Sequence, residues 1–279
     1  MRRSQRIAVI TKLLIDHPNQ IFTLNEIATG IGSAKSTVSE DLAVIKSAFA
    51  EMKLGRIETI TGAAGGVRYI PKLSKAALVE RVEKICAKLE DPARILAGGF
   101  IYLNDLAADP TLIGEIGEMF ADRFAGAEPE YVVTVETSGI PLAVMTARYL
   151  SVPLVVVRRT SRVSEGSVLT VNYVSGSSNR IQTMSLARRA LPVGSRVLLV
   201  DDLMRAGGTL RGLTQLMAEF ESEVVGMGVL IEMEGPAEKL VKDYVSFINL
   251  KQVDPVNHIV KAAPSAWIIT NTEKKCGEE

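Results

Sequence analysis

The sequence predicts an α/β protein of two domains. The first, over residues 1–72, is a small domain of helices and one β-hairpin, and the second, over residues 73–279, is a doubly wound domain with a parallel sheet. The chain has 279 residues, enough for two domains that each bury a core. Helical apolar patterns and one alternating pair of strands fill the first 72 residues. Beyond residue 130, short apolar runs alternate with helical patterns, as in a parallel sheet covered by helices on both faces.

Composition is that of an ordinary globular protein. Hydrophobic residues make up 47% of the chain and charged residues 23%, with no low-complexity tract. The two cysteines, Cys86 and Cys276, lie far apart, which argues against a disulfide framework or a four-ligand zinc site, so no metal centre is expected. We expect neither secretion nor membrane insertion, because charged residues interrupt the apolar run near residue 10 and the apolar run at 154–157 is too short to span a bilayer. We therefore expect a cytoplasmic protein without membrane contact.

Three short amphipathic helices are predicted within the first fifty residues. Apolar side chains recur at helical spacing from Ile7, from Leu24 and from Val38. Thr23, with Glu26 three residues later, predicts a capping box at the start of the second helix. A glycine-containing turn over 30–33 then leads into the third, so the segment has a helix, turn, helix pattern.

A β-hairpin is predicted after these helices. Residues 56–61 and 67–70 alternate apolar and polar side chains, and the glycine-rich segment 62–66 joins them. Three helices and a hairpin are the elements of a winged helix, whose third helix enters the major groove while the hairpin, or wing, meets the DNA backbone. The alternative is a small domain that packs against a protein partner.

The distribution of charge favours DNA. The net charge is zero, yet residues 1–72 carry ten Lys and Arg against six Asp and Glu, a balance of +4 that leaves −4 for the remainder. The third helix begins with small polar or basic residues, which can bond base edges or phosphates. The candidate DNA contacts are Arg2, Arg3, Arg6, Lys35, Ser36, Thr37, Ser39, Ala64, Gly65, Gly66 and Arg68.

The larger domain is predicted to alternate strands and helices. Strands are expected at 131–135, 154–157, 197–200 and 224–231, and helices at 75–89, 111–126, 140–150 and 208–220. Sheets of this kind bind ligands beyond the carboxyl ends of their strands. Residues that directly follow a strand are therefore the candidates for a site.

One of these strands carries the strongest chemical signal. The strand at 197–200 leads into Asp201 and Asp202, and a turn with Gly207 and Gly208 then opens a helix. Free amides at such a turn, reinforced by the helix dipole, suit a terminal phosphate, and paired carboxylates can accept hydrogen bonds from two ribose hydroxyls. The segment lacks the Lys-Ser/Thr pair of a P-loop, so it favours a sugar phosphate over ATP.

This segment resembles the phosphoribosyl pyrophosphate (PRPP) signature of type I phosphoribosyltransferases. The resemblance implies that Asp201 and Asp202 hold the ribose hydroxyls. It also implies that the 5′-phosphate is surrounded by the loop residues Arg205, Ala206, Gly207, Gly208 and Thr209.

Two further segments extend this resemblance. Thr137, Ser138 and Gly139 follow another strand and resemble the pyrophosphate loop of the family, and Arg158 and Arg159 stand where it often has a basic pyrophosphate ligand. Residues 161–182, rich in glycine and serine, match the position of the mobile loop that closes over PRPP. A flexible lid is therefore expected there.

Nearly the whole chain is similar to the purine-operon regulators of Gram-positive bacteria. The residues that carry this resemblance are the third predicted helix, the wing at 62–67 and the segment 173–185. The resemblance implies a homodimer that is not an enzyme. It implies a transcriptional regulator, expected to be a repressor of purine biosynthesis genes, that binds double-stranded operator DNA with PRPP as effector and Mg²⁺ only as the ion that PRPP chelates. Tyr102 stands where this group has an aromatic near the pocket.

Two alternatives stay open. An adenine- or xanthine-type phosphoribosyltransferase with an accessory amino-terminal domain has a similar PRPP segment. Hypoxanthine and guanine enzymes carry a third acid where this chain has Arg205, which counts against them. Arg205 could instead strengthen anion binding, which adds a guanosine alarmone to the candidate effectors.

Overall fold

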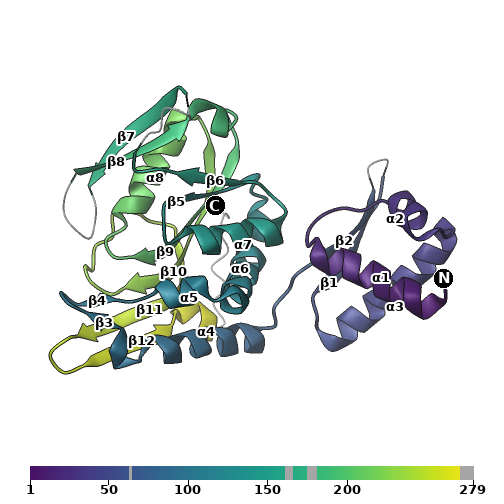
Figure 1. The fold of residues 1–279 in the computed structure, drawn as a ribbon, viewed down its shortest axis with the longest axis horizontal. Helices are drawn as coiled ribbons and strands as arrows, with labels where there is room; N and C mark the ends of the chain where they lie inside the picture. The colour runs from purple at the N-terminus through teal and green to yellow at the C-terminus, as the bar shows by residue number, and fades with distance from the viewer. Residues whose placement is uncertain (63–64, 161–165, 175–180, 271–279) are drawn as a thin grey trace. The chain divides into compact units, whose positions relative to one another are not determined.

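The structure, a computed structural model, describes residues 1–62, 65–160, 166–174 and 181–270. Contacts divide the chain into two compact units (Figure 1). The first comprises Met1–Ser74, with Arg148–Ser151 grouped with it, and the second comprises Lys75–Ala147 and Val152–Glu279. Each unit has a hydrophobic core of its own.

The amino-terminal unit is a winged helix, as predicted. Thr23 caps the second helix, because its side chain accepts a hydrogen bond from the Glu26 amide at 3.1 Å while the Glu26 carboxylate accepts one from the Thr23 amide at 2.7 Å. Gly32 ends that helix in the left-handed conformation, with φ of 63°. The elements are α1 (Arg3–Asp16), α2 (Leu24–Ile31), α3 (Lys35–Met52), β1 (Arg56–Ile60) and β2 (Gly66–Ile70).

The core of this unit explains which face of α3 is exposed. Val38, Leu42, Ile45 and Phe49 are buried against residues of α1, α2 and the hairpin. Because these positions recur every three or four residues, they form one stripe along the helix. At the start of α3, Lys35, Ser36, Ser39 and Glu40 are exposed, whereas Asp41 is buried.

The larger unit is built on a six-stranded sheet in the order β12-β11-β10-β9-β5-β6. All neighbouring pairs are parallel except β11 with β12, so the predicted doubly wound sheet is confirmed with one antiparallel edge strand. The strands are β5 (Tyr131–Val135), β6 (Leu154–Val157), β9 (Arg196–Met204), β10 (Glu223–Met233), β11 (Val245–Asp254) and β12 (Ile259–Pro264).

Helices cover both faces of this sheet. Gly226 and Gly228 of β10 let α6 approach closely, since a Cβ at Gly228 would lie 2.7 Å from Phe124 and 2.9 Å from Phe120. Val229, whose side chain points the other way, packs in the core that includes α8. The helices of this unit are α4 (Lys75–Leu89), α5 (Asn104–Ala108), α6 (Pro110–Phe124), α7 (Ile140–Leu150), α8 (Gly208–Glu219) and α9 (Ala266–Ile269).

Two hairpins complete the unit, and one of them includes the described part of the segment 161–182 that is expected to be a lid. Residues Val168–Val174 (β7) and Ile181–Ala187 (β8) form an antiparallel pair that lies beside α8 (Figure 1). Tyr173 of β7 and Met184 of β8 are buried in the core, where β7 packs against α8. Residues 161–165 and 175–180 of that lid lie outside the described residues. The other hairpin joins β3 (Ile95–Leu96) to β4 (Phe100–Ile101).

Candidate functional site

Two adjacent acids lie near the carboxyl end of β9. Asp201 is 6% exposed, and its Oδ1 accepts a hydrogen bond from the Asp202 amide at 3.1 Å. Burial, and next to it the charge of Asp202, raise the pKa of Asp201 well above the ordinary value of 3.8. Asp202 is only partly buried. The pair therefore places one buried carboxyl group and one more accessible carboxylate side by side, suited to accept hydrogen bonds from neighbouring hydroxyls.

The loop after these acids presents unoccupied amide groups. Within the described part of the chain, the backbone N–H groups of residues 206–209 have no hydrogen-bond acceptor. Gly207 has φ of 82°, and a Cβ there would lie 2.9 Å from Val241, so glycine suits both the conformation and the space. Successive free amides at the start of α8 make an anion-binding loop, which we call the phosphate loop (residues 205–209).

A second loop, after β5, approaches the acids closely. A Cβ at Gly139 would lie 2.7 Å from the Thr134 hydroxyl and 3.3 Å from Oδ1 of Asp201. Glycine therefore permits the loop at 136–139 to pack directly on the buried acid. The hydroxyl of Thr134 is buried and has no hydrogen-bond partner among the described residues.

Glu136 connects this loop to the two arginines after β6. Its carboxylate accepts hydrogen bonds from Nη1 of Arg158 at 3.2 Å and from the backbone amide of Arg159 at 2.7 Å. Arg159 also donates to the Gln182 side chain at 2.9 Å. Glu136 is not among the residues predicted from the sequence, although the parallel pairing of β5 with β6 requires the residue after Val135 to lie beside the residue after Val157.

These groups surround a cavity of about 360 Å³. It continues into a neighbouring cavity of about 800 Å³, which shares Arg205 and adds Glu234 and Lys251. The predicted residues that line the first cavity are Asp201, Asp202, Arg205, Ala206, Gly207, Gly208, Thr209, Ser138 and Arg159.

Other predicted residues lie differently. Thr137, Gly139 and Arg158 flank the first cavity without lining it, and Arg158 forms the ion pair with Glu136. Tyr102 is also absent from the lining, although it directly follows Ile101, which lines the cavity, so its expected place near the pocket stays a prediction. Its backbone is held by Arg94, while Phe100 and Ile101 of β4 line the cavity instead.

In the amino-terminal unit, α3 exposes three of the four predicted DNA contacts that it carries. Lys35, Ser36 and Ser39 are exposed, and Thr37 is half-buried. Arg2 and Arg3 are exposed as well.

Arg6 differs from that expectation. Its side chain is 14% exposed and forms an ion pair of 2.7 Å with Asp41, a buried residue of α3 that the sequence analysis missed. Arg3 also reaches Asp41, at 3.3 Å, but keeps 60% of its side chain exposed. Arg6 therefore links α1 to α3, and its expected DNA contact stays a prediction.

The predicted wing contacts differ in exposure and partners, and their DNA contacts stay predictions. A Cβ at Gly66 would lie 2.4 Å from the Phe22 carbonyl oxygen, and Gly66 is buried where β2 begins opposite Ile60, so its backbone packs closely against Phe22. Gly65 is half-buried. Arg68 forms a 2.7 Å ion pair with Glu58 across the hairpin, and Ala64 lies outside the described residues.

The described residues form neither a metal site nor a membrane-spanning helix. No group of three or more His, Cys, Asp and Glu side chains is placed to hold a metal ion in the described ranges. No described helix combines the length and the apolar character needed to cross a lipid bilayer.

The fold and the sites define a DNA-binding head and a phosphoribosyltransferase-type domain in one chain. A family model described as "Bacterial purine repressor, N-terminal" matches residues 2–71, and one described as "Phosphoribosyl transferase domain" matches residues 103–264. The "Purine biosynthesis transcriptional repressor PurR" of Bacillus subtilis (strain 168) is 47% identical over 253 residues, which cover 91% of this chain and 89% of that protein. The chain therefore belongs to the PurR family of purine biosynthesis transcriptional regulators.

Two other similarities bear on the fold and the family. The "Purine biosynthesis transcriptional activator PurR" of Lactococcus lactis subsp. lactis is 39% identical over 260 residues, covering 93% of this chain and 96% of that protein. The adenine phosphoribosyltransferase of Rhodothermus marinus is 23% identical with a TM-score of 0.51, covering 60% of this chain and 97% of that structure. The chain is thus a transcriptional regulator that reuses the fold of a phosphoribosyltransferase.

Proposed function

We propose that this chain is a cytoplasmic homodimer that represses purine biosynthesis genes by binding operator DNA with an affinity set by PRPP. The observation that carries the proposal is the cavity in which an acid pair at the end of β9 lies beside a loop whose amides have no acceptor among the described residues. These are the two chemistries that a ribose phosphate needs, hydrogen-bond acceptors for hydroxyls and donors for a phosphate.

The groups of PRPP have distinct partners in this proposal. Asp201 and Asp202 accept hydrogen bonds from the ribose hydroxyls, and the amides of residues 206–209 donate to the 5′-phosphate. Ser138 and Arg159, which line the cavity, donate to the diphosphate. Mg²⁺ arrives chelated by that diphosphate, so the protein supplies little of its coordination.

A guanosine alarmone is the second candidate effector. The larger cavity adjoins the PRPP cavity through Arg205 and also contains Lys251, so it offers cationic groups and room for a base and a further phosphate. The residues that would read operator DNA are Arg2, Arg3, Lys35, Ser36, Thr37 and Ser39, with Ala64 and Gly65 at the wing.

The regulation is a thermodynamic linkage between two sites. PRPP can change operator affinity only by the difference between its own affinities for free and DNA-bound protein, which in such systems is about 1 to 3 kcal/mol. Because the two binding equilibria form a closed thermodynamic cycle, DNA changes the affinity for PRPP by the same free energy.

A gel shift on a purine promoter with and without PRPP tests the proposal, run beside a nucleotide-formation assay with each purine base. Retarded DNA that responds to PRPP, with no nucleotide formed, supports a regulator. Product without a shift would support the adenine- or xanthine-type enzyme instead.

Two variants sharpen the gel-shift test. Asp202→Asn should bind the promoter normally and ignore PRPP. Glu219→Gln, which changes an exposed acid at the end of α8, should respond as the wild type does. A PRPP response in Asp202→Asn equal to that of Glu219→Gln would contradict the assignment of the cavity.

A further inference from the structure

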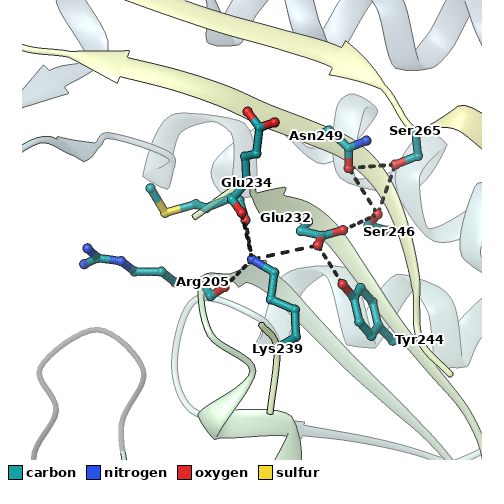
Figure 2. Close-up of polar contacts among 9 residues, drawn as sticks. Arg205, Glu232, Glu234, Lys239, Tyr244, Ser246, Asn249 and Ser265 are labelled. Carbon is teal, nitrogen blue, oxygen red and sulfur yellow. Dashed lines mark hydrogen bonds and ion pairs between the residues drawn. The ribbon is translucent and has the colours of Figure 1, made fainter. Parts of the chain in front are cut away.

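Lys239 is a buried cation directly behind the phosphate loop (Figure 2). It lies in the segment between β10 and β11, and its side chain is only 9% exposed. The ammonium donates to the backbone carbonyls of Arg205 at 2.7 Å and of Met233 at 2.5 Å, with the Glu234 carbonyl 3.5 Å away. Lys239 does not line the cavity, so these carbonyls rather than a ligand are its partners.

The same segment also binds the next carbonyl of the loop. The Leu240 amide donates to the Ala206 carbonyl at 2.8 Å, and the Gly207 carbonyl accepts from the Arg211 amide at 3.0 Å. Three successive carbonyl oxygens of the loop, at residues 205, 206 and 207, are therefore hydrogen-bonded within the protein. The amides of 206–209 remain without an acceptor in the described part of the chain.

The charge of Lys239 is only loosely compensated. The nearest carboxylate is that of Glu232, 3.9 Å away, and Glu232 also accepts hydrogen bonds from the hydroxyls of Tyr244 at 2.6 Å and Ser246 at 2.9 Å (Figure 2). Burial lowers the pKa of Lys239, against the raising effect of Glu232. Because burying an ammonium group is unfavourable, a methionine of similar length would fill this space at a lower cost of desolvation.

We infer that Lys239 is a positioning residue for the phosphate loop, which holds the loop's first carbonyl behind the cavity so that its amides stay available to a terminal phosphate. The inference rests on the proposed function and deepens it, because it assigns a selective role in binding one phosphate of the effector. Lys239 does not touch the ligand. It acts through the backbone of residues 205–207.

The test measures, by calorimetry on the full-length protein, the binding affinities of two ligands that each carry one part of PRPP. Ribose 5-phosphate carries the phosphate that the loop binds, and pyrophosphate carries the group assigned to Ser138 and Arg159. Lys239→Met should weaken the binding of ribose 5-phosphate by about tenfold or more, because charge-assisted hydrogen bonds that order the loop are lost. The affinity for pyrophosphate should stay within about twofold of the wild-type value. Lys242→Met, which changes an exposed lysine three residues later, is the matched control and should alter neither.

The selectivity between the two ligands separates positioning from general stabilisation. If Lys239→Met weakened the binding of both ligands equally, or left ribose 5-phosphate binding unchanged, the inference would be overturned and the proposed function would stand. A wild-type protein that binds neither ribose 5-phosphate nor PRPP would overturn both. Lys239→Gln, which keeps an N–H donor without the charge, should give an intermediate ribose 5-phosphate affinity, and it serves as the test if Lys239→Met shows no cooperative thermal transition.

Discussion

Replacing the buried acid of the pair, Asp201→Asn, should make the protein more stable while it impairs the effector site. The Asp201 carboxyl is 6% exposed, accepts a hydrogen bond from the Asp202 amide and has no ion pair among the described residues. Its pKa is raised because burial and the neighbouring Asp202 disfavour the ionised form. An asparagine has nearly the same shape and removes this unfavourable charge.

The size of the effect follows from the cost of burying a poorly compensated charge. Such a group costs roughly 1–3 kcal/mol, so we expect the free energy of unfolding near neutral pH to rise by that amount. For a domain of this size each kcal/mol corresponds to a shift of about 2–4 °C in Tm. Calorimetry of the wild type and the variant should therefore show an increase of about 2–12 °C. The same variant should bind PRPP about tenfold more weakly or worse, since a charged acceptor for a hydroxyl is lost.

The pH dependence gives the sharper check. A raised pKa means that the folded protein binds a proton more tightly than the unfolded chain, so this group's contribution to stability is complete below the ordinary pKa of 3.8 and is lost as pH rises through the folded value. The stability difference between Asp201→Asn and the wild type should grow with pH over that interval. A difference that is constant or negative across the interval would refute the reasoning.

Three further changes should have effects of defined direction. Asp41→Asn should destabilise the amino-terminal unit by about 2–4 kcal/mol, because Arg6 loses its buried partner, and amide exchange along α3 at unchanged rates would contradict this. Gly228→Ala should destabilise the larger unit by about 1–3 kcal/mol in urea unfolding, because its Cβ would lie 2.7 Å from Phe124, whereas a loss below about 0.5 kcal/mol would mean that the helix moves freely. Lys35→Ala should reduce the slope of log affinity for operator against log salt by about 0.9, and an unchanged slope would remove Lys35 from the phosphate contacts.

Much of the fold could be predicted because local patterns and tertiary environment agree. The strands at 131–135 and 154–157 have the bounds expected from their apolar runs, and Thr23 with Glu26 caps α2 as the capping pattern indicates. The acid pair and phosphate loop were also predictable, since a strand, two carboxylates and a glycine turn occur consecutively in the sequence. These features depend on neighbours in the chain.

The features that could not be predicted from the sequence are those that depend on contacts between residues far apart in the chain. The glycine- and serine-rich composition of 161–182 does not indicate the strand at Val168–Val174, because its residue Tyr173 packs against Gly212 of α8, which is distant in the sequence. The same holds for Glu136 and Asp41, whose partners belong to other elements. The burial of Lys239 could not be predicted from the sequence, because a lysine in a loop is usually solvated.

The ion pair between Asp41 and Arg6 bears on any attempt to re-target the head to a new operator. Lys35, Ser36 and Ser39 are exposed, so a library of substitutions there can alter sequence preference while the helix stays in place. Position 41 lies on the same helix, yet its carboxylate faces inward and anchors the amino-terminal arginines. A library that randomises every position of the helix would contain mostly variants whose amino-terminal domain does not fold. A library that keeps Asp41 and Arg6 fixed would contain folded variants that differ in sequence preference.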